Sequence, residues 1–176
     1  MIQVFCASRG SGKTKRLIEL ANERLSQAKG DSVYIDNDTR YMMQLKRKIR
    51  FINTNELGVI DCDSFYGLLC GVISQNYDVE NIYIDALSNM VECSNLESKN
   101  LFIKLKEFSQ KFNLNLFINL NCDCKENLPD FIKKYAAWIS KVQKWIVFTI
   151  HFFSWPLTIL LLSFNQLIIF KLKDIL

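Results

Sequence analysis

Short apolar runs alternate with amphipathic stretches along the first 137 residues of the chain. The apolar runs predict strands at residues 2–6, 32–35, 51–53, 81–85 and 114–119, with a strand fragment at 58–60. Helices are predicted at residues 14–28, 42–50 and 65–75, from the capping-box sequence at 94–97 through 112, and from 129 to 135. Strands that alternate with helices are typical of an α/β fold, in which helices cover both faces of a parallel sheet. A ligand of such a sheet is expected beyond the carboxyl ends of the strands.

The pattern changes abruptly near the end of the chain. Residues 145–170 are 26 consecutive residues without Asp, Glu, Lys or Arg. Because a helix of about 20 residues spans about 30 Å, the thickness of a bilayer core, we predict that this run crosses or re-enters a membrane. Pro156 near its middle favours a kink or a re-entrant hairpin. More lysines precede the run than follow it, which predicts that the amino-terminal domain is cytoplasmic.

Two other interpretations of this segment stay open. In the first, the segment is a further core helix or a helix that binds a partner. In the second, it is a readthrough or frameshifted extension without a selected function. In each case the predicted organisation is a domain at residues 1–137 followed by a hydrophobic helical tail at 138–176.

The net charge of +4 is distributed unevenly. Residues 1–50 carry eleven Lys and Arg against five Asp and Glu, whereas residues 51–140 carry seven against twelve. A basic amino-terminal part suits a ligand that bears phosphate, although a solvated helix face would have the same composition.

Six cysteines are present, at positions 6, 62, 70, 93, 122 and 124. Several lie in apolar runs, where a thiol behaves as a small hydrophobic group. Cys122 and Cys124 have no second cysteine pair or nearby histidine, so their spacing does not favour a zinc site. The first apolar run leads directly into a polar glycine loop and does not resemble a secretory signal. Reduced thiols and a cytoplasmic location are therefore expected.

The polar segment Ala7–Thr14 follows the first predicted strand and precedes the first predicted helix. It reads Ala-Ser-Arg-Gly-Ser-Gly-Lys-Thr, a phosphate-binding P-loop pattern in which Ala7 takes the place of the first glycine. In such a loop the backbone N–H groups and the helix end form an anion site. The lysine reaches the β- and γ-phosphates, and the hydroxyl of the last residue binds Mg²⁺. The predicted nucleotide-binding residues are Ser8, Arg9, Gly10, Ser11, Gly12, Lys13, Thr14 and Lys15.

Two alternatives to the P-loop interpretation are weaker. A chance Gly-Lys-Thr in a surface turn would not need the strand and helix that flank this one. A dinucleotide-binding turn would need a third glycine, where this chain has Lys15.

Carboxylates at two predicted strand ends are candidates for the metal site. We expect Thr14 and Asp85 to bind Mg²⁺, because Asp85 ends the apolar strand Ile82–Ile84 as a Walker-B aspartate does. Asp36 ends another strand and is the rival for this role. Many ATPases carry a glutamate directly after the Walker-B aspartate, and here that position is Ala86. Fast hydrolysis is therefore not expected, and the catalytic base is not assigned.

Other charged residues have weaker claims on the site. Asp38 and Asp63 could replace the missing base, although turn and cap roles explain both residues better. Arg9 and Arg40 could contact phosphate, as guanidinium groups do. The basic run at residues 46–48 lacks interleaved aromatic residues, so nucleic-acid binding is not expected.

Taken together, four segments of the chain resemble a known group of proteins. These are Ala7–Thr14, Val33–Asp36, Lys48–Asn53 and Val79–Asp85, and Leu128–Tyr135 extends the similarity. The chain resembles small clostridial-type P-loop ATP-binding proteins, which are often labelled twitching-motility (PilT-like) ATPases. The resemblance covers about residues 1–136. It implies a P-loop NTPase-like fold, ATP binding through Gly12, Lys13 and Thr14, and Asp85 as the Walker-B residue.

Three functions are compatible with these observations. The first is an ATP-binding protein that uses Mg²⁺ and hydrolyses ATP slowly or only with an unidentified protein partner. The second is a non-catalytic, nucleotide-responsive adaptor that its tail holds at a membrane. The third is a small phosphotransferase, which would need a lid with arginines, whereas residues 86–97 contain no Arg or Lys.

Overall fold

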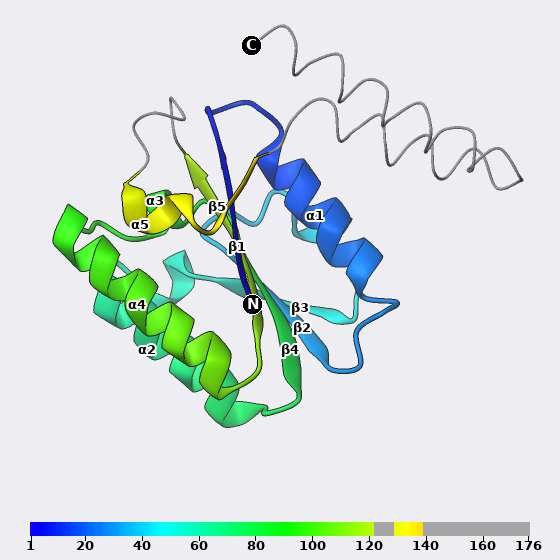
Figure 1. Cartoon of the computed structure of the whole chain (residues 1–176). Helices are drawn as coiled ribbons and strands as arrows, with labels where there is room; N and C mark the ends of the chain where they lie inside the picture. Colours follow the sequence, from blue (N-terminus) through cyan, green and yellow to red (C-terminus); the bar gives the residue numbers. More distant parts are fainter. Residues whose placement is uncertain (122–128, 139–176) are drawn as a thin grey trace, which may run out of the picture. The chain divides into compact units, whose positions relative to one another are not determined.

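Six parallel strands form one sheet in the order β3-β2-β4-β5-β1-β6 (Figure 1). The computed structural model describes residues 1–121 and 129–138, all within one compact unit, Met1–Ile139. The strands are β1 (Ile2–Ala7), β2 (Asp31–Asp36), β3 (Ile49–Asn53), β4 (Val79–Ile84), β5 (Asn115–Asn121) and β6 (Ala136–Trp138). The helices are α1 (Lys13–Arg24), α2 (Cys62–Gln75), α3 (Leu87–Met90), α4 (Asn95–Lys111) and α5 (Asp130–Lys133), with 3₁₀ turns at Met42–Gln44 and Asn55–Leu57. The predicted α/β class with a parallel sheet is confirmed.

Alternate residues of each strand point to opposite faces of the sheet, and each face has its own core. On one face, α1 packs its Leu17, Ile18 and Ala21 against Tyr34, Tyr83 and Phe117. On the other face, α2 and α4 pack against aliphatic neighbours of these residues in the strands, including Val33, Ile35, Ile82, Ile84, Leu116 and Ile118. Figure 1 shows α1 on one side of the sheet and α2 with α4 on the other. We call these the α1 face and the α2/α4 face.

An aromatic row crosses the sheet under α1. Phe51, Tyr34, Tyr83 and Phe117 occupy matching positions on the four adjacent strands β3, β2, β4 and β5. Their ring centroids are 6.2, 6.3 and 5.0 Å apart along the row. Each such ring pair contributes about 0.5–1.5 kcal/mol beyond burial alone, so the row fixes the register of these strands.

The predicted helix at residues 42–50 does not form. The chain makes one 3₁₀ turn at Met42–Gln44 and then runs extended into β3. The side chain of Asn22 on α1 replaces the helical hydrogen bonds, because it donates to the Gln44 carbonyl at 2.8 Å and accepts from the Lys46 N–H at 2.8 Å. Tertiary contacts therefore override the local pattern in this segment.

Several boundaries also differ from the prediction. Helix α2 begins three residues earlier than expected because Asp61 is its N-cap, accepting a hydrogen bond from the Ser64 N–H at 2.7 Å. The expected strand fragment at 58–60 does not form: Gly58 has a φ of 65°, and residues 58–60 connect the 3₁₀ turn Asn55–Leu57 to α2. The last predicted helix is confined to α5, and the chain then adds β6 beside β1. The capping box between Ser94 and Glu97 is confirmed at the start of α4.

The expectation of reduced thiols is wrong for one pair of cysteines. Cys62, the first residue of α2, and Cys93, just before the N-cap of α4, form a disulfide across 31 positions of sequence. The sequence pattern could not show this pairing, because packing of α2 beside α4 brings the two residues together. Cys122 and Cys124 lie outside the described residues.

Within residues 1–121 and 129–138, no helix has the length and apolarity needed to cross a bilayer. The predicted hydrophobic run at 145–170 lies outside the described residues, as does the predicted tail apart from Trp138.

Candidate functional site

The loop Ala7–Thr14 joins the carboxyl end of β1 to the amino end of α1. Gly10 and Gly12 have φ angles of 79° and 85°, in the left-handed region that residues with a Cβ rarely adopt. A Cβ at either position would meet no atom within 4 Å, so conformation rather than space requires glycine here. Residues 8–12 are exposed, which leaves the loop open to a ligand.

The first turn of α1 has no side-chain cap. Gly12 is the N-cap and offers no side-chain hydrogen bond, and the turn contains no acidic residue. In contrast, α2 and α4 both begin with capping boxes, formed by Asp61 with Ser64 and by Ser94 with Glu97. The first N–H groups of α1 and the positive end of its dipole are therefore suited to an anion.

Lys13 places a positive charge inside this loop. Its side chain is buried, and Nζ donates to the carbonyl oxygens of Ala7 at 2.7 Å and Ser8 at 2.8 Å. A longer contact joins Nζ to the Ser11 hydroxyl at 3.5 Å. The ammonium group and the helix end thus reinforce each other at one point of the loop.

Asp36 and Asp85 lie on the α1 face, at the same sheet edge as the loop. Asp36 ends β2 and Asp85 follows β4, each two residues beyond a tyrosine of the aromatic row. Because strand residues two apart share a face, both carboxylates lie on the side that α1 covers. The parallel strands end at one edge, so the structure brings the loop and both carboxylates to that edge.

Asp85 is held by two side-chain donors. The Tyr34 hydroxyl donates to Oδ2 at 3.1 Å, and the Asn119 amide donates to Oδ1 at 2.8 Å. The carboxyl group is almost fully buried, with 2% of Asp85 exposed. Burial, followed by the nearby Asp85 carboxylate, raises the pKa of Tyr34, so Tyr34 stays protonated and keeps donating.

Asp36 is the second buried carboxyl group at this edge. Burial, followed by repulsion from the nearby Asp85, raises the pKa of Asp36 to about 7. Its Oδ1 accepts a hydrogen bond from the Asn37 N–H at 2.7 Å, which opposes this effect in part. Near neutral pH, Asp36 is therefore protonated in a fraction of the molecules.

Thr14 and Asp85, the residues predicted to bind magnesium, carry the oxygen atoms that this ion prefers. Thr14 is the second residue of α1 and is half-buried, and Asp85 has lone pairs beyond those that Tyr34 and Asn119 use. Among the described residues, no group of three or more His, Cys, Asp or Glu side chains is placed to hold a metal. Magnesium does not need such a cage, because it keeps several waters and binds phosphate oxygens with one or two protein ligands.

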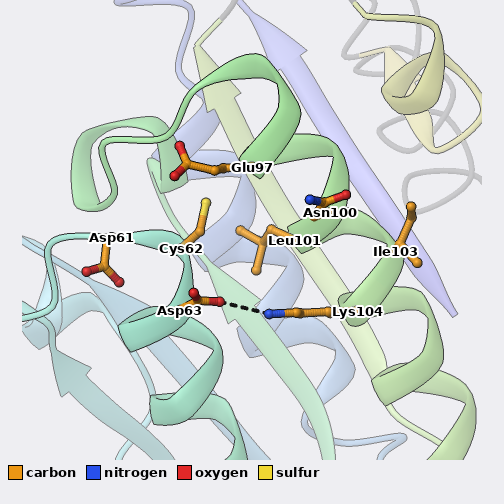
Figure 2. Close-up of a pocket in the computed structure, with 8 residues that line it drawn as sticks. All are labelled: Asp61, Cys62, Asp63, Glu97, Asn100, Leu101, Ile103 and Lys104. Carbon is orange, nitrogen blue, oxygen red and sulfur yellow. Dashed lines mark hydrogen bonds and ion pairs between the residues drawn. The ribbon is translucent and has the colours of Figure 1, made fainter.

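The residue that follows Asp85 has no carboxylate. Ala86 has a φ of 49°, and its methyl group has no proton-accepting atom. Asp63, one substitute considered above, belongs to α2 on the opposite sheet face and pairs with Lys104 at 2.8 Å (Figure 2). The structure therefore separates Asp63 from the loop edge on the α1 face.

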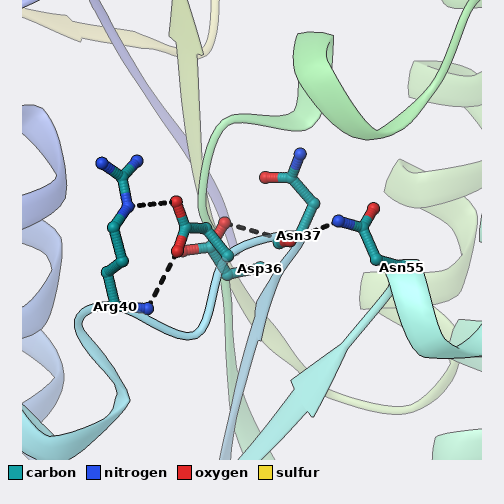
Figure 3. A network of polar contacts seen from close by, with 5 residues as sticks. Asp36, Asn37, Arg40 and Asn55 are labelled. Atoms are coloured by element: carbon teal, nitrogen blue, oxygen red, sulfur yellow. Dashed lines mark hydrogen bonds and ion pairs between the residues drawn. The ribbon is translucent and has the colours of Figure 1, made fainter.

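Asp38 and Arg40 pair with each other rather than with the loop. The Arg40 guanidinium contacts the Asp38 carboxylate at 2.5 Å, and the Arg40 N–H also donates to it at 2.9 Å. Figure 3 shows Arg40 at the exit from β2, beside Asp36 and the contact from the Asn55 amide to the Asn37 carbonyl. Arg40 is exposed. Because Arg40 already pairs with Asp38, a phosphate would have to compete with the Asp38 carboxylate for its guanidinium group.

The remaining basic candidates extend into solvent. Arg9 and Lys15 are exposed at the two ends of the loop turn. The run at residues 46–48 is also exposed, but it precedes β3 and thus lies at the other edge of the sheet.

Sequence reasoning missed Tyr34 and Asn119 as parts of the site. Asn119 is completely buried, and its Oδ1 has no hydrogen-bond partner among the described residues. The available signal was a polar residue at the end of the apolar run Leu116–Ile118, two positions after Phe117. Tyr34 gave no such signal, because an aromatic residue inside a strand needs no functional explanation.

The search for related proteins returns no assignment. Neither a protein-family model nor a curated protein matches this chain. A functional interpretation therefore depends on the geometry and chemistry of the site itself.

Proposed function

We propose that this chain is a P-loop ATP-binding protein that holds Mg·ATP at Ala7–Thr14 and hydrolyses it slowly or only with a protein partner. One observation carries the proposal: Lys13 lies inside an open glycine loop at an uncapped helix start. An anion that enters this loop meets backbone donors, a helix dipole and an ammonium group at the same point.

The binding step follows from the contacts of Lys13. Phosphate oxygens would replace the Ala7 and Ser8 carbonyl groups as acceptors for Nζ, exchanging neutral partners for charged ones. The backbone N–H groups at Gly12 and in the first turn of α1 would bind the neighbouring phosphate oxygens. Bound Mg²⁺ would neutralise phosphate charge, with Thr14 and Asp85 as its protein ligands.

Weak hydrolysis is expected from the residues around Asp85. Ala86 cannot accept a proton, and Asp85 is already bonded to Tyr34 and Asn119. Catalysis would then depend on positioning and charge, or on a group that a partner supplies.

The same feature supports a second candidate function, a nucleotide-responsive adaptor without catalysis. Its attachment to a membrane would depend on residues 145–170, outside the described part. The choice of ATP over GTP rests on the resemblance described above and on the lack of an Asn-Lys-x-Asp guanine motif in the sequence.

Calorimetry of Mg·ATP binding to the full chain tests the binding proposal. Lys13→Met keeps most of the side-chain stem and removes the charge, so its affinity should fall by about tenfold or more, as expected for charge-assisted bonds. Lys99→Met, on an exposed position of α4, is the matched control and should stay within about twofold. Thermal melting of both variants shows whether Lys13→Met is folded. A folded Lys13→Met protein with unchanged affinity would contradict the proposal.

Phosphate release then distinguishes the candidate functions. Slow release that Asp85→Asn abolishes supports the ATPase, and Lys13-dependent binding without release supports the adaptor. Release only after addition of an acceptor alcohol or nucleoside monophosphate supports the phosphotransferase.

A further inference from the structure

The disulfide Cys62–Cys93 joins the beginnings of two helices that pack side by side. Cys62 is the first residue of α2, and Cys93 precedes Ser94, the N-cap of α4. The two helices are also joined by an ion pair between Lys104, in the middle of α4, and Asp63, in the first turn of α2. The disulfide therefore fixes the point at which the connection from β4 enters α4.

This connection begins at Asp85 and has few other anchors. It contains only the four-residue helix α3, which starts after Ala86 in its left-handed conformation. At its start the Asp85 N–H donates to the Ile35 carbonyl at 2.9 Å. Further along, the Asn121 amide donates to the Asn89 side chain at 3.2 Å, and the Glu92 N–H donates to the Ile60 carbonyl at 3.0 Å. Without the disulfide, residues 86–93 would be held, within the described part of the chain, by these hydrogen bonds and by the buried side chains of Leu87, Met90 and Val91.

Both cysteines of the disulfide line pockets. Cys62 lines a cavity of about 470 Å³ (Figure 2) and a second of about 790 Å³, and Cys93 lines the larger one. A small thiol therefore has room to bind beside each cysteine, and exchange begins when its thiolate attacks a sulfur of the bond.

The surroundings of this bond are strongly acidic. The carboxylates of Asp61, Asp63 and Glu97 line the smaller cavity, and that of Glu92 lines the larger. Among the described residues that line the two cavities, Lys104 is the one cationic side chain, and Asp63 already neutralises it. An approaching anion would be repelled, whereas a cation would be attracted.

We propose that Cys62–Cys93 is a thiol–disulfide exchange site that opens to neutral or cationic thiols in preference to anionic ones, and that its opening loosens residues 86–93. The attacking thiolate bonds to one cysteine sulfur, and the other cysteine leaves as a thiolate that takes up a proton. A second thiol then attacks the mixed disulfide, so two cysteine thiols and one reductant disulfide result, with transfer of two electrons. This site goes beyond the proposed nucleotide function, and neither part of its test uses a nucleotide.

The first test compares three thiols of similar size and different charge on the oxidised full chain: cysteamine, 2-mercaptoethanol and 2-mercaptoethanesulfonate. Peptide mapping after alkylation follows Cys62 and Cys93, and each rate is divided by that of the same thiol with hydroxyethyl disulfide. At low salt the normalised rate should be about fivefold or more higher for cysteamine than for the sulfonate, and about 0.5 M salt should remove most of the difference. Equal normalised rates, or two thiols at these positions after oxidation, would overturn the proposal.

Two glutamates provide a matched control for the charge effect. Glu92→Gln removes a carboxylate from the larger cavity, so it should reduce the discrimination between cysteamine and the sulfonate. Glu107→Gln removes an exposed carboxylate on α4 that lines neither cavity, so it should leave the discrimination unchanged. Equal effects of the two substitutions would show that net charge, and not this site, controls the rate.

The second test measures amide hydrogen exchange in the oxidised protein and in the double variant Cys62→Ser, Cys93→Ser. Exchange in residues 86–93 should become about tenfold faster or more, while β2 stays unchanged, as expected for local rather than global opening. Cys70→Ser, which replaces an exposed thiol on the same helix, should exchange as the oxidised protein does. Equal exchange of residues 86–93 in the two states would refute the structural part of the proposal, and faster exchange everywhere would show global destabilisation instead.

Discussion

The two faces of the sheet are built by the same strands but hold different kinds of residue. On the α2/α4 face the strands contribute Ile35, Ile84 and Ile118, whereas the next residue in each strand brings Asp36, Asp85 and Asn119 to the α1 face. Because successive residues of a strand point to opposite faces, neighbouring residues in the chain belong to an aliphatic core on one face and to a buried polar site on the other. The comparison suggests that the α2/α4 face carries the stability that lets the α1 face keep costly buried carboxyl groups.

The helix ends follow the same division. Both helices on the α2/α4 face begin with a capping box, whereas α1 begins at Gly12 with no side-chain cap. A cap stabilises a helix but occupies its first donors. The uncapped α1 therefore gives up some stability at the place where a ligand would bind.

The largest effect is expected from a core substitution on the α2/α4 face. Leu105 on α4 is completely buried, so Leu105→Ala should lower the free energy of unfolding by about 2–5 kcal/mol, through lost burial and a cavity. Leu96 lies on the same helix and is 67% exposed, so Leu96→Ala should cost less than about 0.5 kcal/mol. Urea unfolding measures both values. Similar losses for the two substitutions would show that α4 does not bury the face assigned to it.

Removal of a buried carboxyl group on the α1 face should raise the free energy of unfolding instead of lowering it. The pKa of Asp36 is raised to about 7, so between about pH 4 and 7 the folded state keeps a proton that the unfolded state releases. Stability is therefore lost as the pH rises through this window. Asp36→Asn should stabilise the protein at pH 8 by up to about 4 kcal/mol and change little near pH 4, since each unit of pKa shift is worth about 1.4 kcal/mol.

The measurement for Asp36 is urea unfolding at both pH values, without divalent cations. Asp31→Asn, at the exposed start of the same strand, is the control and should change stability by less than about 0.5 kcal/mol at either pH. A destabilised Asp36→Asn protein at pH 8 would contradict the assignment of Asp36 as a costly buried acid.

Two tyrosines of the aromatic row test the polar side of the comparison more finely. The Tyr34 hydroxyl donates to Asp85, so Tyr34→Phe should cost about 1.5–3 kcal/mol, as for other hydrogen bonds to charged groups. The Tyr83 hydroxyl is buried without a hydrogen-bond partner among the described residues, so Tyr83→Phe should be neutral or stabilising by about 1 kcal/mol. Thermal or urea unfolding at pH 7 gives both values. The reverse order would mean that the network around Asp85 does not hold it.

Local pattern was sufficient for the features that depend on neighbours in sequence. The strand runs, the left-handed glycine loop and the Ser94 capping box all follow from local residue types, and five of the six strands were expected. The helix at 42–50 failed because Asn22, far away in sequence, binds this segment. The three-residue strand β6 was missed because pairing with β1 creates it.

The candidate site divides in the same way. The loop and the strand-end position of Asp85 can be recognised from the sequence alone. Their support cannot, because Tyr34, Asn119 and Asp85 come together only through strand order, with β4 between β2 and β5. The raised pKa of Asp36 likewise depends on burial and on a neighbour in another strand. Sequence therefore indicates which groups are present, and topology decides how each is charged and held.

The smallest predicted effect concerns the helix ends. The Ser94 hydroxyl accepts a hydrogen bond from the Glu97 N–H at 3.3 Å, while Glu97 accepts from the Ser94 N–H at 2.8 Å. Ser94→Ala removes the first of these bonds and should destabilise the protein by about 1 kcal/mol. Ser98→Ala, one turn further along α4, should stay within about 0.5 kcal/mol, because alanine is favoured inside a helix.

The start of α1 has no side-chain cap, so Gly12→Ser tests whether a cap residue can be added there. The left-handed conformation of Gly12 disfavours any residue with a Cβ, so this substitution should destabilise the protein and not stabilise it as a cap would. A stabilised Gly12→Ser protein in urea unfolding would show that the open start of α1 is an ordinary helix end that lacks a cap by chance.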